Sequence, residues 1–289
     1  MPHPELTLEK RIAAELCGLD ATMSVFADDL RGHQICRGAD EAFESASTIK
    51  IYVLGCLYAK AAQGTAALDA VLTYAEKHFV DGSGMLRALG VGAHLRAKDA
   101  ATLMIICSDN IATNMLIDYL GLADINAFIQ SIGCTATTLH RALRSDTWGQ
   151  PLGTITPRDM GRFFTLLARG ALVSPQASAE MRAIFRQQHY NTMLAGNLPP
   201  YYTDAEESGA EEDLIYTASK SGSMDACRND GGLVHTPYGD YVLVLMCKDF
   251  ANKLEVNDHP AMVYGGKVSR LLFDQYLALE GSFAKEGAQ

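Results

Sequence analysis

The sequence lacks the features that mark nucleic-acid-binding, membrane-spanning and metal-binding proteins. It has no run of five or more basic residues, and its net charge of −10 and pI of about 5.2 disfavour a phosphate-binding surface. No stretch approaches the roughly 18 consecutive apolar residues of a membrane span. The histidines show neither H-x-x-x-H nor H-E-x-x-H spacing. We therefore expect no nucleic acid, no membrane, no metal and no cofactor.

A signal peptide and a disulfide framework are also missing. The first residues, M-P-H-P-E-L-T-L-E-K-R, do not show the basic and then apolar layout of a secretory leader. The seven cysteines are odd in number, contain no C-x-x-C and lie mostly in apolar runs, as is typical of free, buried thiols in a reducing compartment. The sequence as it stands indicates a cytoplasmic protein, or a periplasmic or secreted one if a leader has been removed.

What is present is the composition of a globular α+β protein. With 289 residues, 48% of them hydrophobic and 20% charged, the chain can form one or two packed lobes. Two short strands within 22–37 surround the turn residues D-D-L-R-G, and further strand patterns such as Y-V-L-V-L-M-C lie near the other end. Helical patterns fill the middle. We expect an antiparallel sheet built from both termini (1–46 and 190–289) with flanking helices, and an inserted all-helical lobe (47–189).

The run S-A-S-T-I-K, which contains Ser47 and Lys50, places a lysine at the start of an apolar segment. Three residues apart on a helix, these two side chains share one face. A serine hydroxyl needs a base to become a nucleophile, and lysine can act as that base if burial or nearby cations lower its pKa. A helix N-terminus disfavours the ammonium form and offers N–H groups to an oxyanion. Because S-x-x-K is common, this motif alone favours a capping serine followed by a solvated lysine.

Two further motifs favour a catalytic role for Ser47 and Lys50. Ser108-Asp109-Asn110 (S-D-N) lies between two helical segments, and Lys220-Ser221-Gly222 (K-S-G) ends a strand pattern. Each is weak alone, since S-D-N is a frequent helix cap and K-S-G an ordinary strand end. In the order S-x-x-K, S-D-N, K-[ST]-G they form the motif set of class A β-lactamases and penicillin-binding proteins.

Other segments extend the resemblance along the chain. G-S-G-M-L (82–86), K-D-A-A-T-L-M-I-I-C-S-D-N-I-A-T-N-M-L-I-D-Y-L-G (98–121) and T-I-T-P-R-D-M (154–160) resemble class A β-lactamase segments in the expected order. The chain is thus similar to the penicillin-recognising serine hydrolases. That resemblance implies a helical lobe beside an antiparallel sheet with flanking helices, and a covalent acyl-enzyme mechanism.

The resemblance also implies a role for each motif residue. Ser47 would be the nucleophile, Lys50 would accept its proton, directly or through water, and Ser108 would relay a proton to the leaving nitrogen. The backbone N–H groups of Ser47 and Ser223 would form the oxyanion hole. Asp109 would hold its loop together.

Substrate binding falls to a second set of residues by the same resemblance. Asn110 would hydrogen-bond the amide side chain of the substrate. The K-S-G residues Lys220, Ser221 and Gly222 would bind the substrate carboxylate, a charge-assisted contact, and Arg228 could add to this carboxylate site.

One family feature is absent. The class A omega loop carries a glutamate that activates the deacylating water, but residues 139–157 contain none, and its position falls near Leu143. Asn114 matches the asparagine that holds this loop. Asp146 or His140 could replace the glutamate, Lys50 could serve both half-reactions, or deacylation of β-lactams could be slow.

Two more stretches carry weaker expectations. Trp148, the only tryptophan, either walls the site or simply packs, and the acidic residues 203–213 are expected to form an exposed loop. As a whole, residues 1–289 are expected to form one monomeric catalytic unit for a small acyl substrate with a carboxylate. The alternatives are an amidase or esterase on another acyl substrate, and a penicillin-binding or sensing protein that is acylated without efficient turnover.

Overall fold

The computed structural model describes residues 6–147, 149–199 and 214–284. Trp148 and the acidic stretch 203–213 lie outside the described residues. No helix in these three ranges combines the length and the apolar composition of a membrane span.

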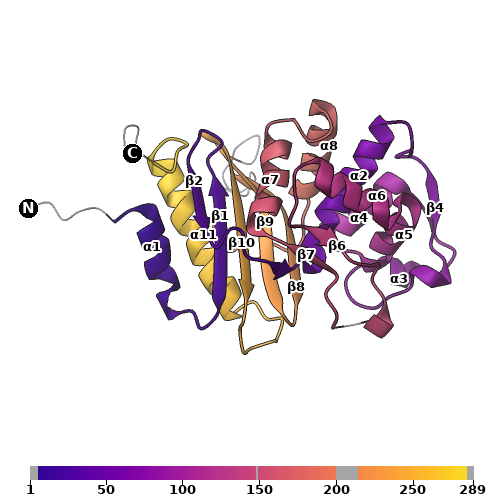
Figure 1. The fold of residues 1–289 in the computed structure, drawn as a ribbon, viewed down its shortest axis with the longest axis horizontal. Helices are drawn as coiled ribbons and strands as arrows, with labels where there is room; N and C mark the ends of the chain where they lie inside the picture. Colours follow the sequence, from indigo (N-terminus) through magenta and orange to yellow (C-terminus); the bar gives the residue numbers. More distant parts are fainter. Residues whose placement is uncertain (1–5, 148, 200–213, 285–289) are drawn as a thin grey trace, which may run out of the picture.

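A five-stranded antiparallel sheet joins the two ends of the chain (Figure 1). Its centre pairs an N-terminal strand with a C-terminal one, from Thr22 opposite Lys248 to Asp28 opposite Val242. The prediction of one sheet built from both termini is therefore confirmed. In the order β2-β1-β10-β9-β8, the strands are Gln34–Arg37, Thr22–Asp28, Gly239–Lys248, Cys227–Thr236 and Tyr216–Met224.

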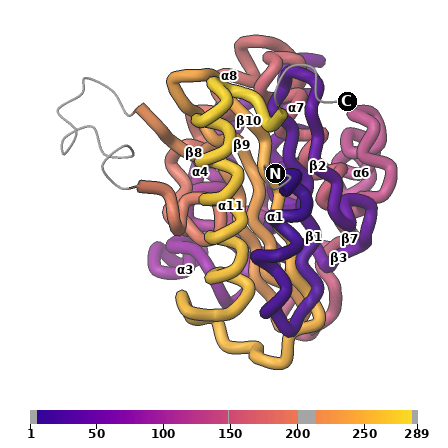
Figure 2. Tube along the Cα trace, turned by 90° about the vertical axis from the view of Figure 1, so that its left-hand side faces the viewer, coloured from indigo at the N-terminus to yellow at the C-terminus, as the bar shows by residue number. Residues whose placement is uncertain are grey.

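The outer face of the sheet is covered by one helix from each end of the chain. Helices α1 (Leu8–Glu15) and α11 (Pro260–Ala278) lie side by side across this face (Figure 2). Strand β10 alternates with period two, so that Tyr241 and Leu243 pack outward against these helices while Val242 and Val244 point to the opposite face.

The inner face carries the larger core and the helical lobe. Helix α7 (Pro157–Ala168) packs directly on β1, β9 and β10, so it belongs to the layer on the sheet although its sequence position falls within the predicted helical lobe. It begins as the T-P sequence predicts, with the Thr156 hydroxyl accepting from the backbone N–H of Asp159 at 3.2 Å.

The helical lobe lies beside strand β8, at the edge of the sheet (Figure 1). Its core is formed where the buried hydrophobic side chains of α2 pack against α4, α5 and α6. Its helices are α2 (Lys50–Ala62), α3 (Leu86–Leu89), α4 (Ala97–Ile106), α5 (Asn110–Leu120), α6 (Leu122–Ser131) and α8 (Pro175–Arg186). Two small sheets complete the lobe, β3-β7-β6 (Phe43–Glu44, Gly153–Ile155, Thr138–Leu139) and β4-β5 (Val71–Thr73, His94–Arg96).

Candidate active site

Ser47 lies where the helical lobe meets the edge strand of the sheet. It is half-buried in a 3₁₀ turn, Ala46–Ile49, which continues into α2. The sequence predicted that Ser47 and Lys50 share one α-helical turn, but the structure has a 3₁₀ turn at Ser47 and begins the α-helix at Lys50. Strand β8 runs so close to it that a Cβ on Gly222 would lie 2.8 Å from the Ser47 nitrogen and 2.9 Å from the Thr48 nitrogen. Only glycine allows β8 to approach the turn so closely, and this contact places the K-S-G strand against Ser47.

Lys50, at the start of α2, is fully buried and is held by the S-D-N loop. Its Nζ donates to the Ser108 carbonyl at 2.8 Å, to the Ser108 hydroxyl at 3.0 Å and to the Asn110 side-chain oxygen at 2.8 Å. These three acceptors match the three N–H donors of an ammonium group. The lysine of S-x-x-K is therefore not a solvated surface residue.

Burial and a neighbouring cation both lower the pKa of Lys50. Loss of solvation is the larger cause and lowers this pKa well below its usual range, and the charge of Lys220 lowers it further, against the opposing effect of Asp109. Burial likewise lowers the pKa of Lys220 to about 7. Two buried lysines that face one site thus make a neutral amine accessible near physiological pH.

The S-D-N loop is shaped by strain and by backbone hydrogen bonds. Ser108 has a φ of 54°, a left-handed conformation that is unfavourable for serine and that clusters at functional sites. The buried carboxylate of Asp109 accepts backbone N–H groups from Met85, Leu86 and Ala112 at 2.6 to 2.9 Å. These bonds tie the loop to its neighbours and leave Asp109 no free oxygen for chemistry.

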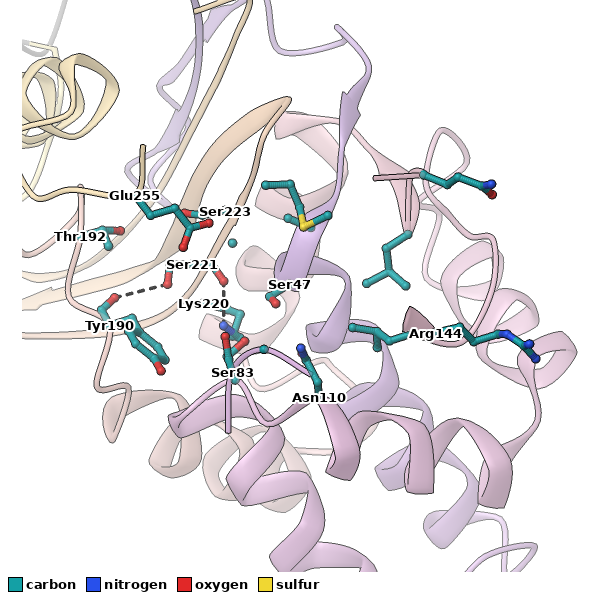
Figure 3. Close-up of a pocket in the computed structure, with 18 of the residues that line it drawn as sticks. Ser47, Ser83, Asn110, Arg144, Tyr190, Thr192, Lys220, Ser221, Ser223 and Glu255 are labelled. Carbon is teal, nitrogen blue, oxygen red and sulfur yellow. Dashed lines mark hydrogen bonds between the residues drawn. The ribbon is translucent and has the colours of Figure 1, made fainter. Parts of the chain in front are cut away.

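A cavity of about 230 Å³ joins the three motifs (Figure 3). Ser47 lies at its centre, with the K-S-G strand on one side and the loop that follows β6 on the other. Lys50 lies below the cavity and reaches it through Ser108 and Asn110. The motif residues that line the cavity are Ser47, Ser108, Asn110, Lys220, Ser221 and Gly222, together with Ser223.

The sheet side of the cavity is polar. Lys220 donates to the Ser221 carbonyl at 2.7 Å, and the Ser221 hydroxyl donates to the Tyr190 carbonyl at 3.4 Å. Tyr190 and Thr192 form the adjoining wall (Figure 3). Within the described residues β8 is an edge strand, and Ser223 on this strand lines the cavity together with Ser47.

Leu143 occupies the loop side of the cavity, where the sequence comparison placed the missing glutamate. Asn114 holds this residue by its backbone, since its amide donates to the Leu143 carbonyl at 2.9 Å and accepts from the Leu143 nitrogen at 2.9 Å. The same amide donates to the His78 carbonyl at 3.1 Å. The loop is thus fixed to α5, and it contributes an apolar residue to the cavity lining.

The two proposed substitutes for that glutamate do not line the cavity. Asp146 is exposed and forms a two-pronged ion pair with Arg144 at 2.8 and 2.9 Å, which also lowers the pKa of Asp146. His140 is exposed, and its Nε2 lies 2.9 Å from the Thr154 hydroxyl. The structure therefore brings neither group to the ester that Ser47 would form.

Arg228 is likewise absent from the cavity lining. It is fully buried, and its guanidinium donates to the carbonyls of Met224, of Cys227 at 2.9 Å, of Lys253 at 2.8 Å and of Leu254 at 3.2 Å. These carbonyls occupy both terminal nitrogens, and the guanidinium is buried outside the cavity lining, so a carboxylate in the cavity does not meet it. Arg228 instead ties the β8–β9 hairpin to the segment that follows β10.

Sequence reasoning missed several cavity residues that belong to no motif. Ser83 lies within the recognised G-S-G-M-L segment, so its position could have been inferred, but Tyr190, Thr192 and Glu255 follow helices or strands in irregular stretches that carry no pattern. Within the described ranges, no three His, Cys, Asp or Glu side chains gather as metal ligands would.

Comparisons with known proteins agree with this geometry. A relative called beta-lactamase from Rhodobacter capsulatus is 25% identical over 224 residues, which cover 76% of this chain and 72% of that protein. The solved structure of PBP-A is 26% identical, superposes with a TM-score of 0.81 and covers 94% of this chain and 96% of its own. A leucine-to-glutamate mutant of PBP-A, solved as an acyl-enzyme complex with penicillin G, gives 26% identity, a TM-score of 0.80 and coverages of 94% and 97%. The family model described as beta-lactamase enzyme family matches residues 7–276, and the chain belongs to this family.

Proposed function

We propose that this serine β-lactamase-like hydrolase is acylated at Ser47 by β-lactams and releases the acyl group slowly. The proposal rests above all on Leu143, an apolar side chain in the place where a deacylating carboxylate would stand. PBP-A, the structural neighbour described above, has been captured as an acyl-enzyme with penicillin G in a mutant form.

Acylation uses the groups that line or underlie the cavity. Neutral Lys50 takes the proton of the Ser47 hydroxyl as its oxygen attacks the lactam carbonyl, and the backbone N–H groups of Ser47 and Ser223 stabilise the oxyanion. The C–N bond then breaks, and Ser108, which contacts Lys50 at 3.0 Å, passes a proton to the leaving nitrogen. The product is an ester on Ser47.

Substrate orientation follows from the two sides of the cavity. The carboxylate, which lies on the leaving-group part of a penicillin, binds toward Lys220, Ser221 and the edge of β8. The acyl side chain then points toward Asn110 and Leu143. The loop side therefore faces the acyl-enzyme ester at the stage when water must attack it.

Deacylation lacks a carboxylate on that side. Leu143 cannot take a proton from water, and Asp146 and His140 are engaged away from the cavity. Lys50 remains the available base near the ester. General base catalysis contributes roughly 10²–10⁴-fold, so loss of a dedicated base gives a long-lived adduct.

The test follows intact protein mass after mixing with penicillin G. An adduct on Ser47 that persists for minutes or longer is expected, and Ser47→Ala should form none. Leu143→Glu, with Leu143→Gln as the isosteric control without charge, should shorten the adduct lifetime by tenfold or more. An adduct that clears within seconds in the unmodified chain would refute slow release, and absence of any adduct would leave an amidase or esterase with another acyl substrate.

A further inference from the structure

Glu255 places a negative charge at the carboxylate-binding end of the cavity. It lines the cavity beside Ser221 and Ser223, on the opposite side of Ser47 from Arg144 (Figure 3). Its side chain is exposed and makes no hydrogen bond or ion pair with the residues that the structure describes. The charge therefore remains available to a bound molecule.

Hydrogen bonds fix the segment that carries Glu255. Arg228 donates to the carbonyls of Lys253 at 2.8 Å and of Leu254 at 3.2 Å, directly before Glu255. The His259 Nε2 lies 2.7 Å from the Asn252 carbonyl, and the Asn252 side chain accepts from the Leu254 nitrogen at 3.0 Å. These hydrogen bonds, which involve residues from Asn252 to His259, fix the irregular loop that carries Glu255.

The charges that line the cavity are distributed unevenly. Arg141 and Arg144 lie on the loop side, whereas Lys220 and Glu255 share the sheet side, and Lys253 is not part of the lining. A substrate whose leaving-group part carries only a carboxylate meets Lys220 favourably and Glu255 unfavourably. A substrate that adds a cation beside the carboxylate satisfies both groups.

We propose that Glu255 makes the leaving-group end of this site selective for substrates that carry a positive charge next to the carboxylate. The natural substrate is then zwitterionic on that side of the scissile bond. This inference rests on the proposed function, because it assumes that the carboxylate binds toward Lys220 and Ser221.

Two cephalosporins provide a matched pair of probes. Cephaloridine and cephalothin share the same acyl side chain and the same carboxylate, but the substituent next to the carboxylate is a pyridinium cation in the first and a neutral ester in the second. The ratio of their dissociation constants, measured in a Ser47→Ala background, reports selectivity without any acylation. The ratio of their acylation rate constants in the Ser47 protein is the second readout.

Glu255→Gln should reduce the preference for cephaloridine by roughly three- to tenfold in both ratios, as expected for loss of one nearby charge at a solvent-exposed site. Raising the ionic strength should reduce the same preference in the unmodified chain. Asp258→Asn removes an exposed charge from the same segment outside the cavity lining, so it should leave both ratios within twofold.

Different results would contradict the selectivity of Glu255 and the proposed function. If the affinity ratio does not change in Glu255→Gln, or changes equally in Asp258→Asn, the selectivity inference is overturned. If neither cephalosporin acylates Ser47, the proposed function is overturned, whereas the affinity ratio in the Ser47→Ala background still decides the role of Glu255.

Discussion

In the proposed mechanism two buried lysines perform different tasks because they have different neighbours. Lys50 is surrounded by acceptors from Ser108 and Asn110. Lys220 lies on β8 in the cavity lining, and the proposal assigns it to the substrate carboxylate. Burial lowers the pKa of both amines, so proton transfer and carboxylate binding depend on pH in opposite directions.

The acylation rate constant for an acidic β-lactam should therefore fall as pH rises above about 7. Lys220, with a pKa of about 7, loses its proton there and with it the charge that attracts the carboxylate, whereas a rise in pH only favours the neutral form of Lys50. Lys220→Arg should move this alkaline decline to higher pH, since a guanidinium stays protonated. The second-order acylation rate constant for penicillin G, measured from pH 5.5 to 9, checks this.

Lys98→Arg is the matched control, because Lys98 pairs with Glu180 on the surface of the helical lobe, outside the cavity lining. It should leave the profile unchanged. An unshifted alkaline decline in Lys220→Arg would show that another group titrates.

The contact between strand β8 and the 3₁₀ turn at Ser47 assembles the site from two elements that are distant in sequence. Gly222 allows this contact, since its missing side chain leaves room for the backbone nitrogens of Ser47 and Thr48. Those nitrogens are backbone atoms and cannot swing aside as a flexible side chain would. The distance between the oxyanion donors therefore depends on this one residue.

Gly222→Ala should impair both acylation and stability. The new methyl group would push β8 away from the turn, and misplacement by a fraction of an ångström to 1 Å can cost about 10²-fold in rate. Overpacking should lower the free energy of unfolding by about 1–3 kcal/mol. Acylation by penicillin G and thermal unfolding measure the two effects.

Gly64→Ala is the control, because it should lower stability without affecting acylation. Gly64 has a φ of +71° with open space around its Cβ position, so alanine there should cost about 1–2 kcal/mol of stability through backbone strain. Its acylation rate should not change. Equal acylation by Gly222→Ala and the unmodified chain would contradict the proposed role of the close contact.

The molecule as a whole is joined by a core that both lobes share. A single cluster of buried side chains includes Tyr52 of α2 and Val242 of β10. Within this cluster, the Phe163 ring on α7 packs edge to face against two other rings. The distance between ring centroids is 5.4 Å to Tyr52 and 6.1 Å to Phe185 on α8. Because α7 also packs on the sheet, the two lobes should unfold together.

Phe163→Ala should lower stability by about 3–5 kcal/mol, because it removes a fully buried ring and leaves a cavity. At roughly 2–4 °C per kcal/mol for a chain of this size, the Tm should fall by about 10 °C. Calorimetry and far-ultraviolet circular dichroism should show one coincident transition before and after the change. Phe79→Ala, at a ring that is 48% exposed, should shift the Tm by less than about 3 °C. Two separate transitions would contradict the shared core.

The motifs, their order and the strand and helix patterns were sufficient to predict the sheet, the helical lobe and the motif residues of the cavity. Such features are local, since a few neighbouring residues encode whether a side chain faces a core or solvent. The partners of Arg228 and the position of Glu255 were not predictable in this way. Arg228 matched a carboxylate-binding position by spacing, yet its guanidinium binds carbonyls 25 and 26 residues further along the chain. Only packing brings those carbonyls to it, and the same packing places Glu255 at the cavity.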